Sequence, residues 1–400
     1  LHPRTRQAIE RYGLDLPSIP AAYGNVKPND QSLVAVDPLG YLDMQTSALP
    51  FHLSSIRRLL VLGAGGGSPV QQAANHDVAH IDAVELNPQV IGLVAHEYAD
   101  YAGHLYTRPG VRVHATEARG FLAGTAHRYD LIQLAARGGS DAGMHALNES
   151  YVYTIEAITT YLEHLSPDGY LAINSWIRLP PRDSLKHLAT ATQALRLAGH
   201  DNPAERLVMI RGWQTATLLV KNSPFTADEI KRLRAFSQAR SFDPAWYPGM
   251  PASEANRFNI LAQPFFFNAA HALLGKDSES FMARYKFDIE PATDNRPYFF
   301  NFFRWDIVPE VLELRGQGGL PLLESGYLVL VAALLQATII SVVLIVLPLM
   351  GLGRRDSSRQ DDVSRMRTVL YFFAIGIAFL FIEIAFIQRF IQFLHHPLYA

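Results

Sequence analysis

The residues between Leu62 and Ser68 have the composition of a loop that binds a nucleotide through its backbone. The apolar run Leu59–Leu62 ends in Gly63-Ala64-Gly65-Gly66-Gly67, and Ser68-Pro69 then opens a predicted helix. Glycines adopt positive φ angles and let the backbone approach a ligand, while the following helix presents free N–H groups to it. Taken alone the motif is weak, because a tight strand-to-helix turn without a ligand uses the same residues.

Two acidic residues farther along the chain could complete such a site. Glu85 ends a predicted strand, where a carboxylate can accept hydrogen bonds from both ribose hydroxyls of a nucleoside. The alternative is an ordinary acid stabilised by the dipole of the next helix. Glu117 follows the next strand and could accept the adenine amino group, and Arg119 either pairs with it or contacts the ligand. Asp130, where a further strand begins, is predicted to be structural.

A regular alternation of strands and helices would bring these residues to one edge of a sheet. The hydrophobic pattern predicts strands at Leu59–Leu62, Ile81–Glu85, Val111–Ala115, Leu131–Leu134 and Tyr170–Asn174, helices at Asn87–Tyr98, Ile155–Leu165 and Ser184–Ala198, and a closing antiparallel pair at Arg206–Arg211 and Ala216–Lys221. This order predicts an α/β fold, a doubly wound, Rossmann-like sheet that binds ligands at the carboxyl ends of its strands.

Four regions follow from this pattern. Residues 1–50 are predicted to be a small β appendage, with strands at Ser32–Val36 and Tyr41–Thr46. Residues 51–222 form the nucleoside-binding α/β domain. Residues 223–324 are an α-rich extension that opens with a helix capped by Thr226 and Glu229. Residues 325–400 are predicted to form transmembrane helices.

The membrane prediction rests on apolar length. Ser325–Gly353 contains 29 consecutive uncharged residues, and a helix needs about 20 apolar residues to span a bilayer. Spans are predicted at about 325–350 and 368–394, although Glu383 and Arg389 interrupt the second. The chain starts at Leu1 and ends in an apolar stretch, so we expect it to be part of a longer protein.

The overall composition excludes several classes of site. With 35 basic and 37 acidic residues the net charge is −2, which gives no electrostatic reason to expect nucleic acid as a partner. The absence of cysteine excludes disulfides and thiolate metal ligands. The fifteen histidines are scattered and form no recognised motif, so no metal site is expected.

In this order and spacing the motifs resemble those of class I S-adenosylmethionine-dependent transferases. Within that superfamily the chain is most similar to membrane-integrated, spermidine synthase-like bacterial proteins. The resemblance covers most of the chain and is carried by Gly63–Gly67, Val84–Pro88, Glu117–Leu122, Tyr129–Leu134, Asn148–Thr154, Thr293–Phe300 and Phe381–Phe390.

The resemblance implies that the ligand is S-adenosylmethionine or its decarboxylated form, acting as co-substrate without a metal. It also implies an integral protein of a bacterial inner membrane, in contact with the lipid bilayer. The α/β domain is expected on the cytoplasmic side, because the donor is a cytosolic metabolite. A homodimer is left open. The expected ligand-binding residues are Gly63, Ala64, Gly65, Gly66, Glu85, Leu86, Glu117, Ala118 and Leu134.

The loop after the fourth strand departs from the family pattern. Soluble spermidine synthases carry acids there that orient and deprotonate the attacking amine, whereas this chain has Ala135 and Gly138 at the aligned positions. Asp141 is the predicted catalytic residue. His145, Glu149, Tyr151 and Tyr153 are the other candidates near the loop, although both tyrosines are expected to be packing residues.

Two functions therefore stay open. The first is a membrane-anchored transferase that moves an aminopropyl or methyl group to an unidentified amine or lipid-like acceptor. The second is an inactive sensor or scaffold that binds the same adenosyl ligand. A nicotinamide dehydrogenase is a weaker third reading, because Ser68 stands where the third glycine of a dinucleotide loop would fall.

Overall fold

The computed structural model describes residues 40–135, 148–309, 325–347 and 359–394. The chain divides into two units, Leu1–Tyr41 and Leu42–Ala400. Of the first unit only Gly40 and Tyr41 are described, so the architecture below is that of the second unit. Asp141, Gly138, His145 and the predicted strand Ser32–Val36 lie outside the described residues.

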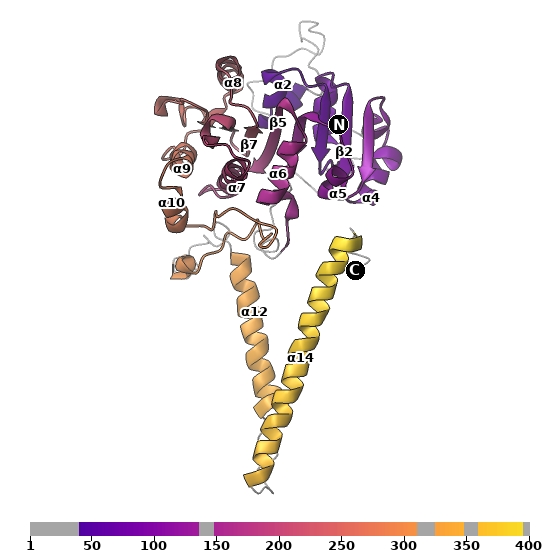
Figure 1. Cartoon of the computed structure of the whole chain (residues 1–400), viewed down its shortest axis with the longest axis vertical. Helices are drawn as coiled ribbons and strands as arrows, with labels where there is room; N and C mark the ends of the chain where they lie inside the picture. The colour runs from indigo at the N-terminus through magenta and orange to yellow at the C-terminus, as the bar shows by residue number, and fades with distance from the viewer. Residues whose placement is uncertain (1–39, 136–147, 310–324, 348–358, 395–400) are drawn as a thin grey trace, which may run out of the picture. The chain divides into compact units, whose positions relative to one another are not determined.

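One mixed β-sheet of eight strands organises the α/β domain (Figure 1). Its spatial order is β3-β2-β1-β4-β5-β7-β6-β8. The first five strands in that order are parallel, and β7, β6 and β8 continue the sheet in antiparallel pairs. The strands are β1 (Arg58–Leu62), β2 (His80–Glu85), β3 (Val111–Ala115), β4 (Tyr129–Leu134), β5 (Leu165–Trp176), β6 (Leu207–Arg211), β7 (Thr215–Lys221) and β8 (Asp243–Trp246).

Helices cover both faces of the sheet because its inner strands are apolar on both sides. In β1, Leu60 and Leu62 belong to one buried cluster while Leu59 and Val61 belong to the other. The first cluster includes α5 (Ala118–Ala123), α6 (Ile155–Glu163), α7 (Asp183–Leu197) and α9 (Phe265–Leu274), and α10 (Ser278–Arg284) packs beside them. The second includes α2 (Leu49–Leu53), α3 (Ser68–Asn75) and α8 (Ala227–Arg240), with α4 (Pro88–Gly92) at its margin.

Short helical turns complete the described part of the domain. A π-helical turn, η4 (Leu93–Glu97), extends α4. The 3-10 turns are η2 (Gly40–Met44), η3 (Thr46–Ala48), η5 (Leu105–Thr107), η7 (Tyr151–Tyr153), η8 (Pro203–Arg206), η9 (Ala252–Glu254) and η10 (Trp305–Ile307).

Strand register brings the carboxyl ends of the parallel strands level with one another. Leu62 pairs with Val84 on one side and with Leu134 on the other, and Glu85 pairs with Ala115. The glycine loop, Glu85 and the residues after β3 and β4 therefore lie along one edge of the sheet, where doubly wound folds bind their ligands.

The prediction of alternating strands and helices is confirmed, but the β appendage is corrected where the structure describes it. Residues Tyr41–Thr46, predicted as a strand, form the 3-10 turns η2 and η3. The buried side chains Leu42, Thr46, Leu49 and Leu53 follow a spacing of three to four residues, which is helical rather than alternating. In addition, Gln72 Nε2 donates a hydrogen bond of 2.6 Å to the Leu42 carbonyl.

The helix predicted from Thr226 is confirmed, and its cap is also part of a buried ion pair. Thr226 and Glu229 form a reciprocal capping box at the start of α8. Glu229 Oε1 accepts a hydrogen bond of 2.8 Å from Lys221 Nζ and another from the Tyr170 hydroxyl. This cluster joins α8 to the adjacent strands β5 and β7.

The predicted membrane-spanning segments need correction. The structure has a 17-residue helix α12 (Ser325–Ser341), a π-helical turn η13 (Val342–Val346) and a 36-residue helix α14 (Arg359–Leu394). A span needs about 20 apolar residues; α12 has 17 residues before it passes into the π-helical turn η13, and α14 begins in a stretch rich in Arg and Asp and contains Glu383 and Arg389. Within the described ranges no helix combines enough length and apolarity to cross a membrane. This finding contradicts the predicted spans and the prediction of an integral protein of a bacterial inner membrane that rested on them.

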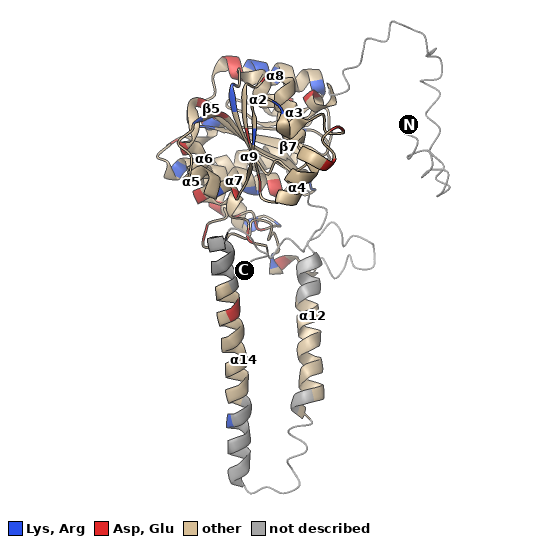
Figure 2. Cartoon of the chain, turned by 90° about the vertical axis from the view of Figure 1, so that its right-hand side faces the viewer, with Lys and Arg blue, Asp and Glu red and all other residues tan. Residues whose placement is uncertain are grey.

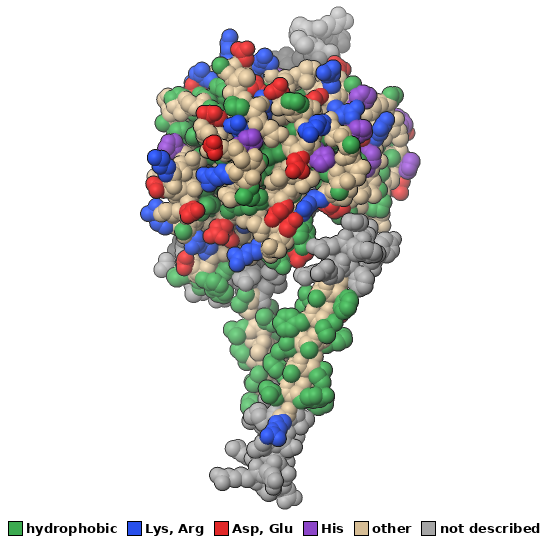
Figure 3. All heavy atoms as spheres, viewed as in Figure 1, with side chains coloured by type: hydrophobic (Ala, Val, Ile, Leu, Met, Phe, Trp, Pro, Cys, Tyr) green, Lys and Arg blue, Asp and Glu red, His purple; other side chains and the backbone are tan. Residues whose placement is uncertain are grey.

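Charge is distributed unevenly between the described parts. Figure 2 shows Lys and Arg interspersed with Asp and Glu over the α/β domain, whereas the described residues of α12 and α14 are mostly uncharged. Figure 3 shows apolar side chains along the described lengths of these two helices.

Candidate functional site

The glycine loop has a backbone shape that requires glycine. Gly63, Gly65 and Gly67 have φ angles of 77°, 51° and 91°. At Gly67 a Cβ atom would also lie 2.5 Å from Leu105 Cδ2, so any side chain would force a local shift. In contrast, the Cβ positions of Gly63 and Gly66 have no heavy atom within 4 Å. The loop therefore presents open space beside its backbone.

Glu85 fixes this loop through its carboxylate. Oε2 accepts a hydrogen bond of 2.9 Å from the Gly65 N–H, and Oε1 accepts one of 2.9 Å from the Asn87 N–H. A carboxylate has about four acceptor positions, so the two bonds leave Glu85 able to accept hydroxyl groups as well. Glu85 therefore stabilises the backbone and keeps acceptor capacity for a ligand, and its role in binding ribose stays a prediction.

Tyr106 also holds the loop, and sequence reasoning missed it. Its hydroxyl donates a hydrogen bond of 2.5 Å to the Gly65 carbonyl. Burial, reinforced by the nearby Glu85 carboxylate, raises the pKa of Tyr106, so the phenol stays protonated and remains a donor. Tyr106 lies in η5, between α4 and β3, where no periodic pattern or motif marks it.

Glu117 lies at the N-terminus of α5 and caps it. Its Oε2 accepts hydrogen bonds from the backbone N–H groups of Arg119, at 2.7 Å, and Gly120, at 2.9 Å. Because both bonds end on Oε2, Oε1 keeps acceptor capacity toward a ligand. The side chain of Arg119 does not pair with Glu117; Nη1 donates to both carboxylate oxygens of Asp294, at 2.8 and 2.9 Å.

Asp294 connects two motifs that are far apart in the sequence. Besides Arg119, it accepts a hydrogen bond of 2.7 Å from Thr154 Oγ1, and its own N–H donates to Glu156 Oε2 at 3.0 Å. The Ser150 N–H donates to the Pro297 carbonyl at 2.7 Å. The segments Asn148–Thr154 and Thr293–Phe300 therefore lie together beside the N-terminus of α5.

Asn174, near the end of β5, brings a polar side chain to the end of β4 at this edge. The Ala135 N–H donates to the Leu62 carbonyl at 3.2 Å. Asn174 Nδ2 donates to the Leu134 carbonyl at 3.2 Å, and Thr217 Oγ1 donates to Asn174 Oδ1 at 2.7 Å. Ala64, Ala118 and Leu134 are buried, while Leu86 is exposed.

Glu149 is the described acid among the candidates near the loop after β4. Tyr151 Oη donates to Glu149 Oε2 at 3.1 Å, and Tyr298 Oη lies 3.5 Å from Oε1. Burial and the adjacent Glu149 raise the pKa of Tyr298. Tyr153 is buried between His187, Phe299 and Phe300, so it packs rather than reacts.

Asp130 lies at the edge of the sheet where the parallel strands begin, away from the glycine loop, which agrees with the prediction that it is a structural residue. Its Oδ2 accepts hydrogen bonds of 3.0 Å from the backbone N–H groups of Arg57 and Arg58, and its Oδ1 accepts one of 3.0 Å from Ser166 Oγ. These contacts join the beginnings of β1, β4 and β5.

Comparison with known proteins gives sequence relatives for part of the chain. It is 30% identical to a polyamine aminopropyltransferase of Lachnoclostridium phytofermentans over 113 residues, which are 28% of this chain and 40% of that protein. It is also 30% identical to a polyamine aminopropyltransferase of Vibrio vulnificus over 142 residues, 34% of this chain and 43% of that protein. The chain therefore spans about two fifths of the length of these relatives.

No model of a protein family matches the chain. Among solved structures, a probable spermidine synthase from Corynebacterium glutamicum has 16% sequence identity and a TM-score of 0.38, over 50% of this chain and 69% of that one. The strand order and the glycine loop make the fold a Rossmann-like α/β fold, and part of the sequence is similar to that of polyamine aminopropyltransferases.

Proposed function

We propose that the chain is a transferase that binds an adenosyl sulfonium donor at the glycine loop and moves its aminopropyl group to an amine. The observation that carries the proposal is the Glu85 carboxylate, hydrogen-bonded to Gly65 at the edge where the parallel strands end. The similarity to polyamine aminopropyltransferases favours decarboxylated S-adenosylmethionine over S-adenosylmethionine as donor.

The residues present fit such a donor. The open backbone beside Gly63 and Gly66 gives room for it, Glu85 offers acceptors to the ribose hydroxyls, and Glu117 Oε1 offers one to the adenine amino group. Leu86 and Ala118 would line the apolar faces of the base, and Leu134 would close the side next to β4. This assignment uses seven of the nine ligand-binding residues predicted from the sequence, all except Ala64 and Gly65.

Transfer needs alignment and removal of one proton. The amine nitrogen attacks the carbon next to the sulfonium, the carbon–sulfur bond breaks, and its electron pair stays on sulfur as a neutral thioether. The nitrogen then gives a proton to a base. Asp141 is our proposed base, and Glu149, held by Tyr151 and Tyr298, is the alternative among the described residues.

The acceptor should differ from putrescine. Ala135 and Gly138 occupy the positions where soluble spermidine synthases carry acids, and neither side chain can bind an ammonium group or take up a proton. We therefore propose another amine-bearing or lipid-like molecule as acceptor.

A transfer assay with two labelled donors tests the proposal. Purified chain is incubated with decarboxylated S-adenosylmethionine labelled in the aminopropyl group, or with methyl-labelled S-adenosylmethionine, and a panel of amines that includes putrescine. We expect labelled product from the aminopropyl donor with an amine other than putrescine. Efficient spermidine formation, at roughly 1–10³ per second, would contradict the acceptor proposal. Donor binding without transfer to any amine would contradict the transferase.

A further inference from the structure

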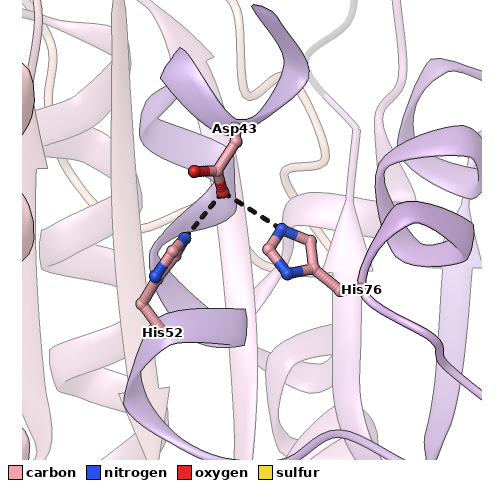
Figure 4. Close-up of side chains that lie close together, drawn as sticks. All are labelled: Asp43, His52 and His76. Atoms are coloured by element: carbon pink, nitrogen blue, oxygen red, sulfur yellow. Dashed lines mark hydrogen bonds and ion pairs between the residues drawn. The ribbon is translucent and has the colours of Figure 1, made fainter. Parts of the chain in front are cut away.

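Three side chains with metal-binding atoms converge near the start of the described chain (Figure 4). His52 Nε2 lies 2.6 Å from Asp43 Oδ1, and His76 Nε2 lies 3.1 Å from the same oxygen. One ligand atom from each residue can be chosen so that all three lie within 4.8 Å of one another. Sequence reasoning expected no metal site, because positions 43, 52 and 76 form no recognised motif.

Three separate elements supply these residues, and packing orients both imidazole rings. Asp43 lies in η2, His52 in α2, and His76 directly follows α3. The His76 ring stacks on Phe51 with centroids 4.7 Å apart and planes 3° apart, and the His52 ring lies 4.8 Å from Phe236. Both Nε2 atoms consequently point to the same carboxylate oxygen (Figure 4).

Arg240 binds the other side of the carboxylate. Its Nη2 donates to Asp43 Oδ2, and its Nε donates to the Asp43 backbone carbonyl at 2.7 Å. Carboxylates that bind metals are themselves commonly hydrogen-bonded in this way, which fixes their orientation. However, Arg240 Nη2 also lies 3.4 Å from His52 Nε2, so its positive charge would weaken the binding of a cation.

We propose that Asp43, His52 and His76 bind a divalent transition-metal ion of the zinc class. Two imidazoles and one carboxylate are ligands that zinc prefers, with a fourth position left for water. Bonds of about 2.0–2.1 Å in a tetrahedral site place neighbouring ligand atoms about 3.3 Å apart. The 3.1 Å contact of His76 with Asp43 already matches, and that of His52 needs to lengthen by less than about 1 Å. The two imidazole nitrogens lie within 4.8 Å of each other and need to approach by up to about 1.5 Å. Magnesium and calcium fit poorly because they require oxygen ligands.

This site is separate from the proposed donor site. α3 starts next to the glycine loop at Gly67 and runs for eight residues before His76, a length of about 12 Å at 1.5 Å per residue. The metal would therefore bind toward the edge where the strands begin and would join η2, α2 and α3, with Arg240 of α8 as their neighbour. We expect it to stabilise the fold without taking part in transfer.

Titration with zinc and cobalt tests the proposal. We expect full-length protein, stripped of metal by a chelator, to bind one Zn²⁺ per chain by calorimetry. Co²⁺ should give the visible absorption of a four-coordinate ion, and Zn²⁺ should raise the unfolding temperature. His52→Ala and His76→Ala should each lower Zn²⁺ affinity at least tenfold. The matched control is His104→Ala, since His104 pairs with Asp100 at 3.0 Å on the surface and belongs to no group of three possible metal ligands among the described residues; this variant should bind Zn²⁺ like the wild type.

Arg240→Gln gives an independent readout that does not remove a ligand. Because it removes the competing positive charge, it should raise Zn²⁺ affinity severalfold. Absence of Zn²⁺ binding, or equal affinity in the wild type and both histidine variants, would show that the three residues form only a hydrogen-bonded cluster. Circular dichroism of each variant confirms that it has folded. Donor binding is measured separately, so loss of either site can be recognised without the other.

Discussion

Glu85 and Glu117 hold the backbone of the same segments from which they would bind a ligand. Glu85 bonds to the Gly65 N–H of the loop, and Glu117 caps α5 through the N–H groups of Arg119 and Gly120. Each carboxylate is thus oriented before a ligand arrives, which lowers the ordering cost of binding. Tyr106 supports this arrangement from the other side of the loop, by donating to the Gly65 carbonyl.

His187 should make the stability of the protein depend on pH. Burial, with a smaller contribution from Lys186, lowers the pKa of His187 to about 3, against about 6.5 in the unfolded chain. Between these values the unfolded state binds a proton that the folded state does not, so stability is lost as pH falls below 6.5. The loss is about 1.4 kcal/mol per pH unit, or about 2 kcal/mol between pH 7 and pH 5.

Urea unfolding at pH 7 and pH 5 measures this contribution. His187 stacks on Phe299 with centroids 4.3 Å apart, so His187→Phe keeps an aromatic ring there and removes the titration. Between pH 7 and pH 5 the free energy of unfolding of the variant should fall by about 2 kcal/mol less than that of the wild type. An equal loss in both proteins would show that His187 does not titrate in this way.

At the scale of elements, the buried pair Lys221–Glu229 fixes α8 against the sheet. The Glu229 carboxylate accepts hydrogen bonds from Lys221 Nζ, the Tyr170 hydroxyl and the Thr226 N–H at the same time. Lys221 is 2% exposed, and its other acidic neighbour, Asp168, is 4.0 Å away at the surface. Removing the charge of Glu229 would leave a buried ammonium group with little compensation.

Glu229→Gln should therefore lower the free energy of unfolding by about 3–5 kcal/mol, the range for breaking a buried ion pair. Adding Lys221→Met should recover much of this loss, because no buried charge then remains. Chemical unfolding of both variants and of the wild type provides the comparison. If Glu229→Gln lowered the free energy of unfolding by less than about 1 kcal/mol, solvent would have to reach Lys221 and compensate its charge.

Hydrophobic periodicity predicts those strands whose apolar sequence pattern matches their burial in the folded domain. The inner parallel strands β1, β2, β4 and β5 and the antiparallel pair β6–β7 are of this kind, because their apolar runs are buried on both faces, whereas the edge strand β3 is only partly buried. β8 was not predicted, since Asp243-Pro244 resembles a turn and the strand lies at the sheet edge, where proline is tolerated. The pattern of Tyr41–Thr46 alone predicts a strand, because the helical spacing of Leu42, Thr46, Leu49 and Leu53 becomes visible only when the residues up to Leu53 are included.

The candidate site was predictable only where its residues occur in motifs. The glycine loop and the acids Glu85 and Glu117 follow strands at a regular spacing, so the sequence locates them. Tyr106 and the pairing of Arg119 with Asp294 depend on contacts across 41 and 175 residues, and no local pattern encodes such contacts. The same holds for Asp43, His52 and His76, which come from three elements.

At the scale of the whole α/β domain, the two proposed sites use opposite edges of one sheet. The proposed donor site lies where the parallel strands end, and the proposed metal site lies toward the edge where they begin. Asp294 brings the segment Thr293–Phe300 to the edge of the proposed donor site through Arg119 and Thr154, although this segment is far from the glycine loop in sequence. Transfer activity should thus depend on Glu85 and be insensitive to His76.

Calorimetric titration with decarboxylated S-adenosylmethionine tests the central claim, that the glycine loop and Glu85 bind an adenosyl donor. We expect one binding site per chain, and an affinity about 10–100-fold lower in Glu85→Ala, since a hydrogen bond to a charged group contributes about 1.5–3 kcal/mol. Glu97→Ala, which changes an exposed glutamate in η4, is the matched control and should bind like the wild type. Absence of saturable binding, or unchanged affinity in Glu85→Ala, would contradict the account.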